Sequence, residues 1–102
     1  MKNSKCRDVT SNIDFIKAMY TRFTKQPEQL KKLEELRSMK HRASLLPSEK
    51  DMRILGEAHV LSQNYKVYFV TDDKDFIYFK NEIQKELNIV VIELLELPHF
   101  TL

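Results

Sequence analysis

Three stretches in the first half of the chain repeat apolar residues at the spacing of an α-helix. Ser11, followed by Asp14, resembles a capping box and predicts a helix over residues 11–24. Pro27 suits the first turn of a second helix, which we expect to end near residues 46–47. The apolar positions that these two helices should bury are Ile13, Ile16, Tyr20 and Phe23 in the first, and Leu30, Leu33, Leu36, Met39 and Ala43 in the second.

A third helix is predicted to begin after Pro47. Ser48 is a good N-cap residue, and Asp51 three positions later completes a box-like start. Because Asp51 precedes Leu55 by one helical turn, we place its side chain on the inward face of this helix. The apolar stripe that the helix should bury consists of Ile54, Leu55, Ala58 and Leu61.

The second half alternates strands and a helix. Residues 67–70 form a continuous apolar run and predict a strand buried on both faces, and residues 89–92 predict a second strand. Strands joined by a helix pair in parallel with a right-handed crossover. We therefore predict an α/β fold, with N-terminal helices followed by helix, strand, helix and strand. The apolar face of the connecting helix is Phe76, Phe79, Ile83 and Leu87.

Length and composition narrow the class of protein. The chain of 102 residues suits one domain, which we place over residues 11–97, after a flexible lead-in over 1–10 and before a tail over 98–102. A formal net charge of +2 creates no global field for nucleic acid or anionic membranes. Cys6 is the single cysteine, and no apolar run approaches the ~20 residues of a membrane helix. We expect a cytoplasmic protein without membrane contact.

Three carboxylates follow the first predicted strand within four positions. They are Asp72, Asp73 and Asp75. Ligands of open α/β sheets bind at the carboxyl ends of the strands, so this turn is where a site is expected. Carboxylates crowded in one turn repel one another unless protons, lysine side chains or a divalent cation compensate their charge.

The order of these features resembles the C-terminal half of a PIN domain, a family of metal-dependent ribonucleases that includes many toxins of toxin–antitoxin pairs. The resemblance covers roughly residues 48–97, and its most specific part is the Thr-x-Asp-x-Asp-Phe run over residues 71–76. It implies an incomplete PIN-like three-layer fold. By this likeness Asp51 matches the third acid of the family, Asp73 the fourth and Asp75 a frequent additional one, while Thr71 supports the cluster.

The resemblance implies hydrolysis of RNA phosphodiester bonds. Asp51, Asp73 and Asp75 would hold Mg²⁺ or Mn²⁺, because these ions prefer carboxylate oxygen. The ion would supply a nucleophilic water and relieve the charge on the phosphate. Lys74 and Arg53 are the basic residues that we expect to contact RNA.

One part of the family pattern is absent. A PIN domain begins with a strand that ends in the first catalytic Asp, followed by a helix that carries a Glu, and neither is found at the start of this sequence. Of the early aspartates, Asp8 has no apolar strand before it and Asp14 is explained as a cap. We therefore expect either a fragment or divergent remnant of the domain, or a second chain that supplies the missing strand.

Two interpretations follow for the acids. In the first, they form the metal site of a ribonuclease. In the second, Asp51 and one acid of residues 72–75 cap helices, the others are solvated, and the chain is a non-catalytic PIN-derived binding or oligomerisation module. In that case the exposed edge of the sheet would be covered by a partner chain or by another copy in a homo-oligomer.

Overall fold

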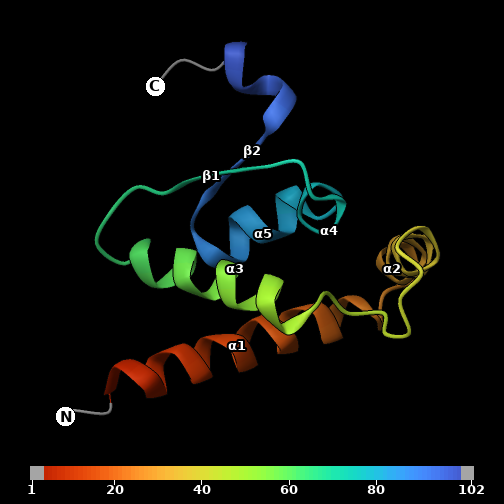
Figure 1. Cartoon of the computed structure of the whole chain (residues 1–102), viewed down its shortest axis with the longest axis horizontal. Helices are drawn as coiled ribbons and strands as arrows, with labels where there is room; N and C mark the ends of the chain where they lie inside the picture. Colours follow the sequence, from red (N-terminus) through yellow and green to blue (C-terminus); the bar gives the residue numbers. More distant parts are fainter. Residues whose placement is uncertain (1–3, 100–102) are drawn as a thin grey trace. The chain divides into compact units, whose positions relative to one another are not determined.

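The computed structural model describes residues 4–99 and confirms the α/β class, with helices and a two-stranded parallel sheet. These residues fall into two compact units, of which the first ends at Glu57 and the second begins at Ala58. None of the helices between residues 4 and 99 is long and apolar enough to cross a bilayer. In chain order the elements are α1 (Ser4–Phe23), α2 (Pro27–Met39), α3 (Glu49–Leu61), β1 (Tyr68–Thr71), α4 (Lys74–Ile77), α5 (Lys80–Leu87), β2 (Val90–Glu93) and the 3-10 helix η1 (Leu94–His99) (Figure 1).

Helix α1 begins at Ser4, so the start expected at Ser11 is wrong. The preceding residues contain no proline or glycine to interrupt a helix, and the cap-like pair at Ser11 lies inside it. The predicted stripe is largely confirmed, since Ile16, Tyr20 and Phe23 are buried. The rings of Tyr20 and Phe23 meet edge to face, with centroids 5.3 Å apart.

Helix α2 begins at Pro27 as predicted but ends at Met39, well before residues 46–47. His41 adopts a left-handed conformation with φ of 52°, which turns the chain out of the helix. The N–H of Arg42 then donates to the carbonyl of Arg37 at 3.1 Å, the hydrogen bond of a Schellman motif. The expected extension is wrong because this local cap closes the helix.

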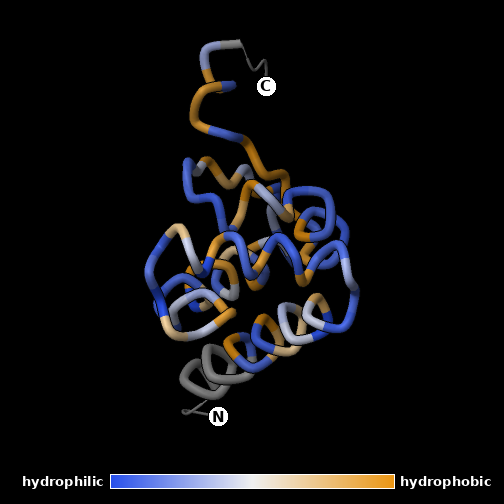
Figure 2. The backbone as a smooth tube through the Cα atoms, turned by 90° about the vertical axis from the view of Figure 1, so that its right-hand side faces the viewer, coloured by the Kyte–Doolittle hydropathy of each residue, from blue (hydrophilic) through white to orange (hydrophobic). Residues whose placement is uncertain are grey.

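The helices bury only part of their apolar side chains, and Figure 2 shows hydrophobic and hydrophilic residues alternating along them. The predicted positions that are buried in α2 and α3 are Leu33, Leu36, Leu55 and Ala58. The predicted positions that are exposed instead are Met39, Ile54 and Leu61, together with Ala43 beyond the end of α2. In α3 the buried face includes Met52, so it is rotated toward residues 52, 55 and 58 relative to the predicted stripe.

Gly56 of α3 yields a prediction about packing within the first unit. A Cβ atom at this position would lie 2.8 Å from Cβ of Asn12, closer than packed side chains allow. Gly56→Ala usually stabilises an exposed helix, but here we expect it to lower the free energy of unfolding by about 1–3 kcal/mol. Urea unfolding measures this, with Glu57→Ala on the exposed neighbour as the control. An unchanged or higher stability would contradict the close approach.

The parallel pairing of the two strands is confirmed. Tyr68 lies opposite Val90, and the register continues to Thr71 opposite Glu93. The prediction that the first strand is buried on both faces is wrong, because Tyr68 is 37% exposed and Val70 is 41% exposed. Burial alternates along β1, which is the pattern of a strand covered on one face.

The single connecting helix expected between the strands is interrupted. It consists of α4 and α5, separated at Tyr78 and Phe79. Phe79 has φ of −116° and ψ of 26°, outside the helical region. The interruption does not change the predicted core face, since Phe76, Phe79, Ile83 and Leu87 are all buried.

The last turn of α3 is attached to the end of α5 by two hydrogen bonds. Nδ1 of His59 lies 3.0 Å from the carbonyl oxygen of Leu87, and the hydroxyl of Ser62 donates to the same oxygen at 3.1 Å. Asn88, with φ of 56°, then ends α5 and directs the chain into β2. The two hydrogen bonds fix the end of α3 within the second unit.

Candidate metal site

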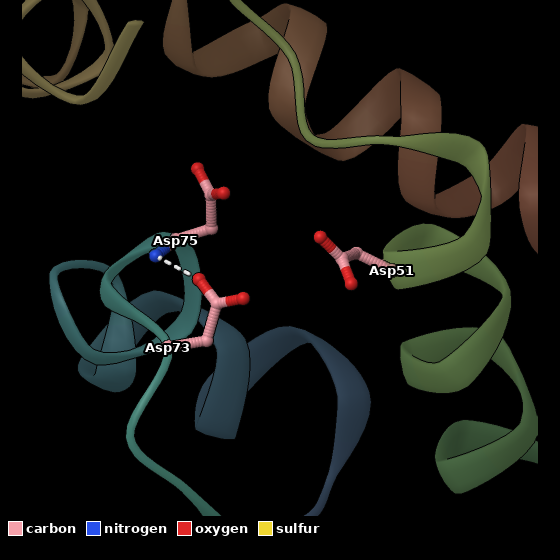
Figure 3. A group of neighbouring side chains, drawn as sticks. All are labelled: Asp51, Asp73 and Asp75. Atoms are coloured by element: carbon pink, nitrogen blue, oxygen red, sulfur yellow. Dashed lines mark hydrogen bonds between the residues drawn. The ribbon is translucent and has the colours of Figure 1, made fainter. Parts of the chain in front are cut away.

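Asp73 and Asp75 lie together in the turn between β1 and α4. Asp73 is the N-cap of α4, and its Oδ1 accepts a hydrogen bond from the N–H of Asp75 at 2.8 Å, drawn as a dashed line in Figure 3. The predicted capping role of one of these acids is therefore confirmed.

The side chain of Asp75 is completely buried. Placing a carboxylate out of contact with water is costly unless hydrogen bonds, a cation or a proton compensate it. The two acids differ in this respect, because Asp73 is only half-buried. Asp75 is therefore the more desolvated of the two acids, and it lies one residue beyond the first position of α4.

Thr71 connects the end of β1 to these acids. Its Oγ1 accepts a hydrogen bond from the N–H of Asp73 at 3.0 Å. Thr71 thus orients the main chain of Asp73, and Asp73 in turn holds the main chain of Asp75. The neighbouring Asp72 is exposed. The structure therefore brings together three of the predicted site residues, Thr71, Asp73 and Asp75, in one short segment.

Asp51 lies in the first turn of α3 and is half-buried. Its N–H donates to the hydroxyl of Ser48 at 3.2 Å, which confirms Ser48 as the predicted cap. This hydrogen bond uses the main chain of Asp51 and leaves the cap independent of its carboxylate. A change at the carboxylate, such as Asp51→Asn, therefore keeps the Ser48 cap.

The two basic residues predicted to contact RNA are both exposed. Lys74 is the first residue of α4, next to Asp73 and Asp75 in the chain, and Arg53 lies on α3. Exposure makes both side chains accessible to a ligand.

A cavity of about 400 Å³ lies beside β2, and its lining contains none of the residues Asp51, Asp73 and Asp75. Sequence reasoning did not identify the residues that line it, among which Gln84 and Glu96 accept hydrogen bonds from the main chain of β2. Their only sequence signal is a polar residue near a strand, which is too common to be specific. The lining consists of Lys80, Gln84, Val90, Val91, Ile92, Leu95 and Glu96.

Glu96 gives a prediction on pH. The hydrogen bond from the N–H of Glu93, followed by the hydrogen bond and charge of Lys80, lowers the pKa of Glu96 below its ordinary value of 4.5. The charged form is favoured in the folded state, so its contribution is present above pH 4.5 and disappears as the pH falls through the lowered pKa. We expect Glu96→Gln to make unfolding less sensitive to pH in this acidic range, measured by thermal unfolding at successive pH values. An identical pH profile would contradict this role.

Comparisons of the chain with protein-family models, with curated proteins and with solved structures found no match.

Proposed function

We propose that this chain is a PIN-like, metal-dependent ribonuclease whose ion is held by Asp51, Asp73 and Asp75. One observation carries the proposal. Asp73 and the completely buried Asp75 lie in one turn at the end of β1, where the N–H of Asp75 donates to Oδ1 of Asp73 at 2.8 Å. Carboxylate oxygen is the ligand that Mg²⁺ and Mn²⁺ prefer, and Asp51 is included because it matches the third acid of the PIN family.

The inclusion of Asp51 is supported by its own surroundings in α3. Asp51 is half-buried, and the Ser48 cap uses its N–H and not its carboxylate. The carboxylate is therefore not required for the Ser48 cap.

Each residue of the site has a distinct role in this proposal. Asp75 contributes a buried carboxylate, and Asp73 contributes an oxygen while it caps α4. Thr71 holds the main chain of Asp73 in place. When bound, the ion would lower the pKa of a water molecule and reduce the charge on an RNA phosphate. The exposed Lys74 and Arg53 would bind neighbouring phosphates of the RNA.

Incubation of the purified chain with a mixed RNA pool tests this function. We expect cleavage in the presence of Mg²⁺ or Mn²⁺, its loss on addition of a chelator, and its recovery when the metal is restored. Ca²⁺ serves as a further comparison, because it accepts longer and less regular coordination than Mg²⁺. Cleavage that persists in the chelator would point to a contaminating nuclease and would contradict the proposal.

A second candidate function is a non-catalytic binding or oligomerisation module derived from a PIN domain. The observation in its favour is that residues 4–61 contain no strand, and that the sheet within residues 4–99 has two strands. The strand that carries the first catalytic Asp in the family is therefore not found between residues 4 and 99. In this case Asp51, Asp73 and Asp75 could be replaced with little effect on partner binding.

A further inference from the structure

The two outer edges of the sheet differ. Along β2, the N–H of Val91 donates to Oε1 of Gln84 at 2.9 Å, and the N–H of Glu93 donates to Oε1 of Glu96 at 3.0 Å. Side chains thus occupy two donors that another strand would need. Proteins protect exposed edges in this way against unwanted pairing. The edge formed by β2 is closed within the chain itself.

The outer edge of β1 presents a different arrangement. The N–H of Val90 donates to the carbonyl of Val67 at 2.9 Å, so the main-chain groups of Val67 face β2. Because these groups alternate along a strand, those of Tyr68 and Val70 point away from β2. The four side chains that share one face along this segment are all exposed, namely Lys66, Tyr68, Val70 and Asp72.

We propose that the outer edge of β1 pairs antiparallel with β1 of a second copy of this chain, about a two-fold axis at Phe69. In this register Tyr68 lies opposite Val70 of the other copy, and both direct their main-chain groups toward the shared edge. A shift by one residue would place an outward-facing residue opposite an inward-facing one, so it is excluded. The two sheets would join into one sheet of four strands.

The charges of Lys66 and Asp72 favour this register and favour a second copy of the chain as the partner. Lys66 of one copy lies opposite Asp72 of the other, and the two-fold axis repeats this pair at the far end of the ladder. Shifting the ladder by two residues in either direction removes both pairs. A parallel arrangement of the same edges would place Lys66 opposite Lys66 and Asp72 opposite Asp72. The segment is therefore complementary to itself only in the antiparallel register.

The other side chains of the segment agree with this pairing. Tyr68 and Val70, both exposed in one chain, would form an aromatic and β-branched pair across the strands, a favourable combination. Phe69, which contacts Phe76 edge to face at 5.2 Å, would meet its own counterpart at the axis. The pairing of two such short strands would bury less accessible surface than the roughly 1,200 Å² of a stable interface. We therefore expect a weak dimer whose amount depends on the protein concentration.

Sedimentation equilibrium over a wide concentration range tests the proposal with paired charge reversals. We expect wild type to dimerise, Lys66→Asp and Asp72→Lys each to weaken dimerisation by about ten-fold, and the double variant to restore it. Lys25→Asp and Asp14→Lys, which make the same changes of charge at other exposed positions, should have little effect. Circular dichroism verifies that every variant folds.

Three results would overturn the pairing. They are a monomer at every concentration, a dimer that ignores both reversals, and a double variant that is no better than the single ones. If the chain is monomeric at every concentration, the outer edge of β1 would be available only to a different protein. The proposal does not depend on the metal site, because it uses neither Asp51, Asp73 nor Asp75. Failure of metal-dependent cleavage and failure of dimerisation can therefore be told apart.

Discussion

Replacing Asp73 with Asn is expected to abolish metal-dependent RNA cleavage while the protein remains folded. Asn still has an oxygen that can accept the hydrogen bond from the N–H of Asp75, and Asn is as good an N-cap as Asp. It lacks the negative charge by which a carboxylate binds a divalent ion more strongly than an amide does. Since outer-shell substitutions alone typically cost 10–100-fold, we expect a loss of at least about 100-fold for a direct ligand.

The measurement is the cleavage rate at increasing Mg²⁺ concentrations, with thermal unfolding of the same samples. Glu49→Gln is the matched control, since Glu49 is an exposed acid in the first turn of α3, two residues from Asp51, and lies outside the proposed ligand set. It should retain the wild-type rate. An Asp73→Asn protein that is folded and still cleaves RNA at a rate close to wild type would exclude Asp73 as a ligand.

Phe79→Ala is expected to have the largest effect on stability, lowering the free energy of unfolding by about 3–5 kcal/mol. The Phe79 side chain has no exposed surface, and it lies where α4 passes into α5. Truncation would leave a cavity in the second unit and remove the contacts of a whole ring. The free energy of unfolding of domains of this size is only about 5–15 kcal/mol, so this substitution would remove a large part of it.

Urea unfolding followed by circular dichroism measures this loss. Tyr65→Ala provides the control, because Tyr65 is an aromatic residue that is 69% exposed, and surface substitutions usually change stability by no more than about 0.5 kcal/mol. If Phe79→Ala cost less than about 1 kcal/mol, Phe79 would not belong to the core. The packing described for the second unit would then be wrong.

The elements of this fold could be predicted where periodicity and local caps agree. Ile16, Tyr20 and Phe23 repeat at helical spacing and are buried in α1, and Ser48 caps α3 through the N–H of Asp51. The parallel pairing followed from two apolar runs joined by a helical segment, and the structure contains it. In each case the residues that determine the feature lie within a short stretch of the sequence.

Other features depend on conformations or neighbours that periodicity does not encode. The end of α2 is set by the left-handed backbone of His41, a conformation favoured by glycine or asparagine and only occasionally adopted by other residues. The exposure of Val70 depends on which elements cover β1, because an apolar run alone does not distinguish a strand buried on two faces from one buried on one.

The candidate site was predictable to the extent that its residues are close in sequence. Thr71, Asp73 and Asp75 occupy one turn after a strand, and the side chains of Thr71 and Asp73 accept hydrogen bonds from the main chains of Asp73 and Asp75. The complete burial of Asp75 could not be predicted, because the turn pattern is equally compatible with a solvated acid. The hydrogen bonds of Gln84 and Glu96 to β2 were also unpredictable, since they depend on tertiary placement.

Titration of the ¹⁵N-labelled chain with Mg²⁺ or Mn²⁺, followed by NMR, tests the central claim most directly. If Asp51, Asp73 and Asp75 share one ion, their signals and those of adjacent residues should change together and saturate at the same metal concentration. In Asp73→Asn the changes at Asp51 and Asp75 should require much more metal. Unchanged signals at all three residues in millimolar metal would contradict the site and leave Asp73 as a helix cap.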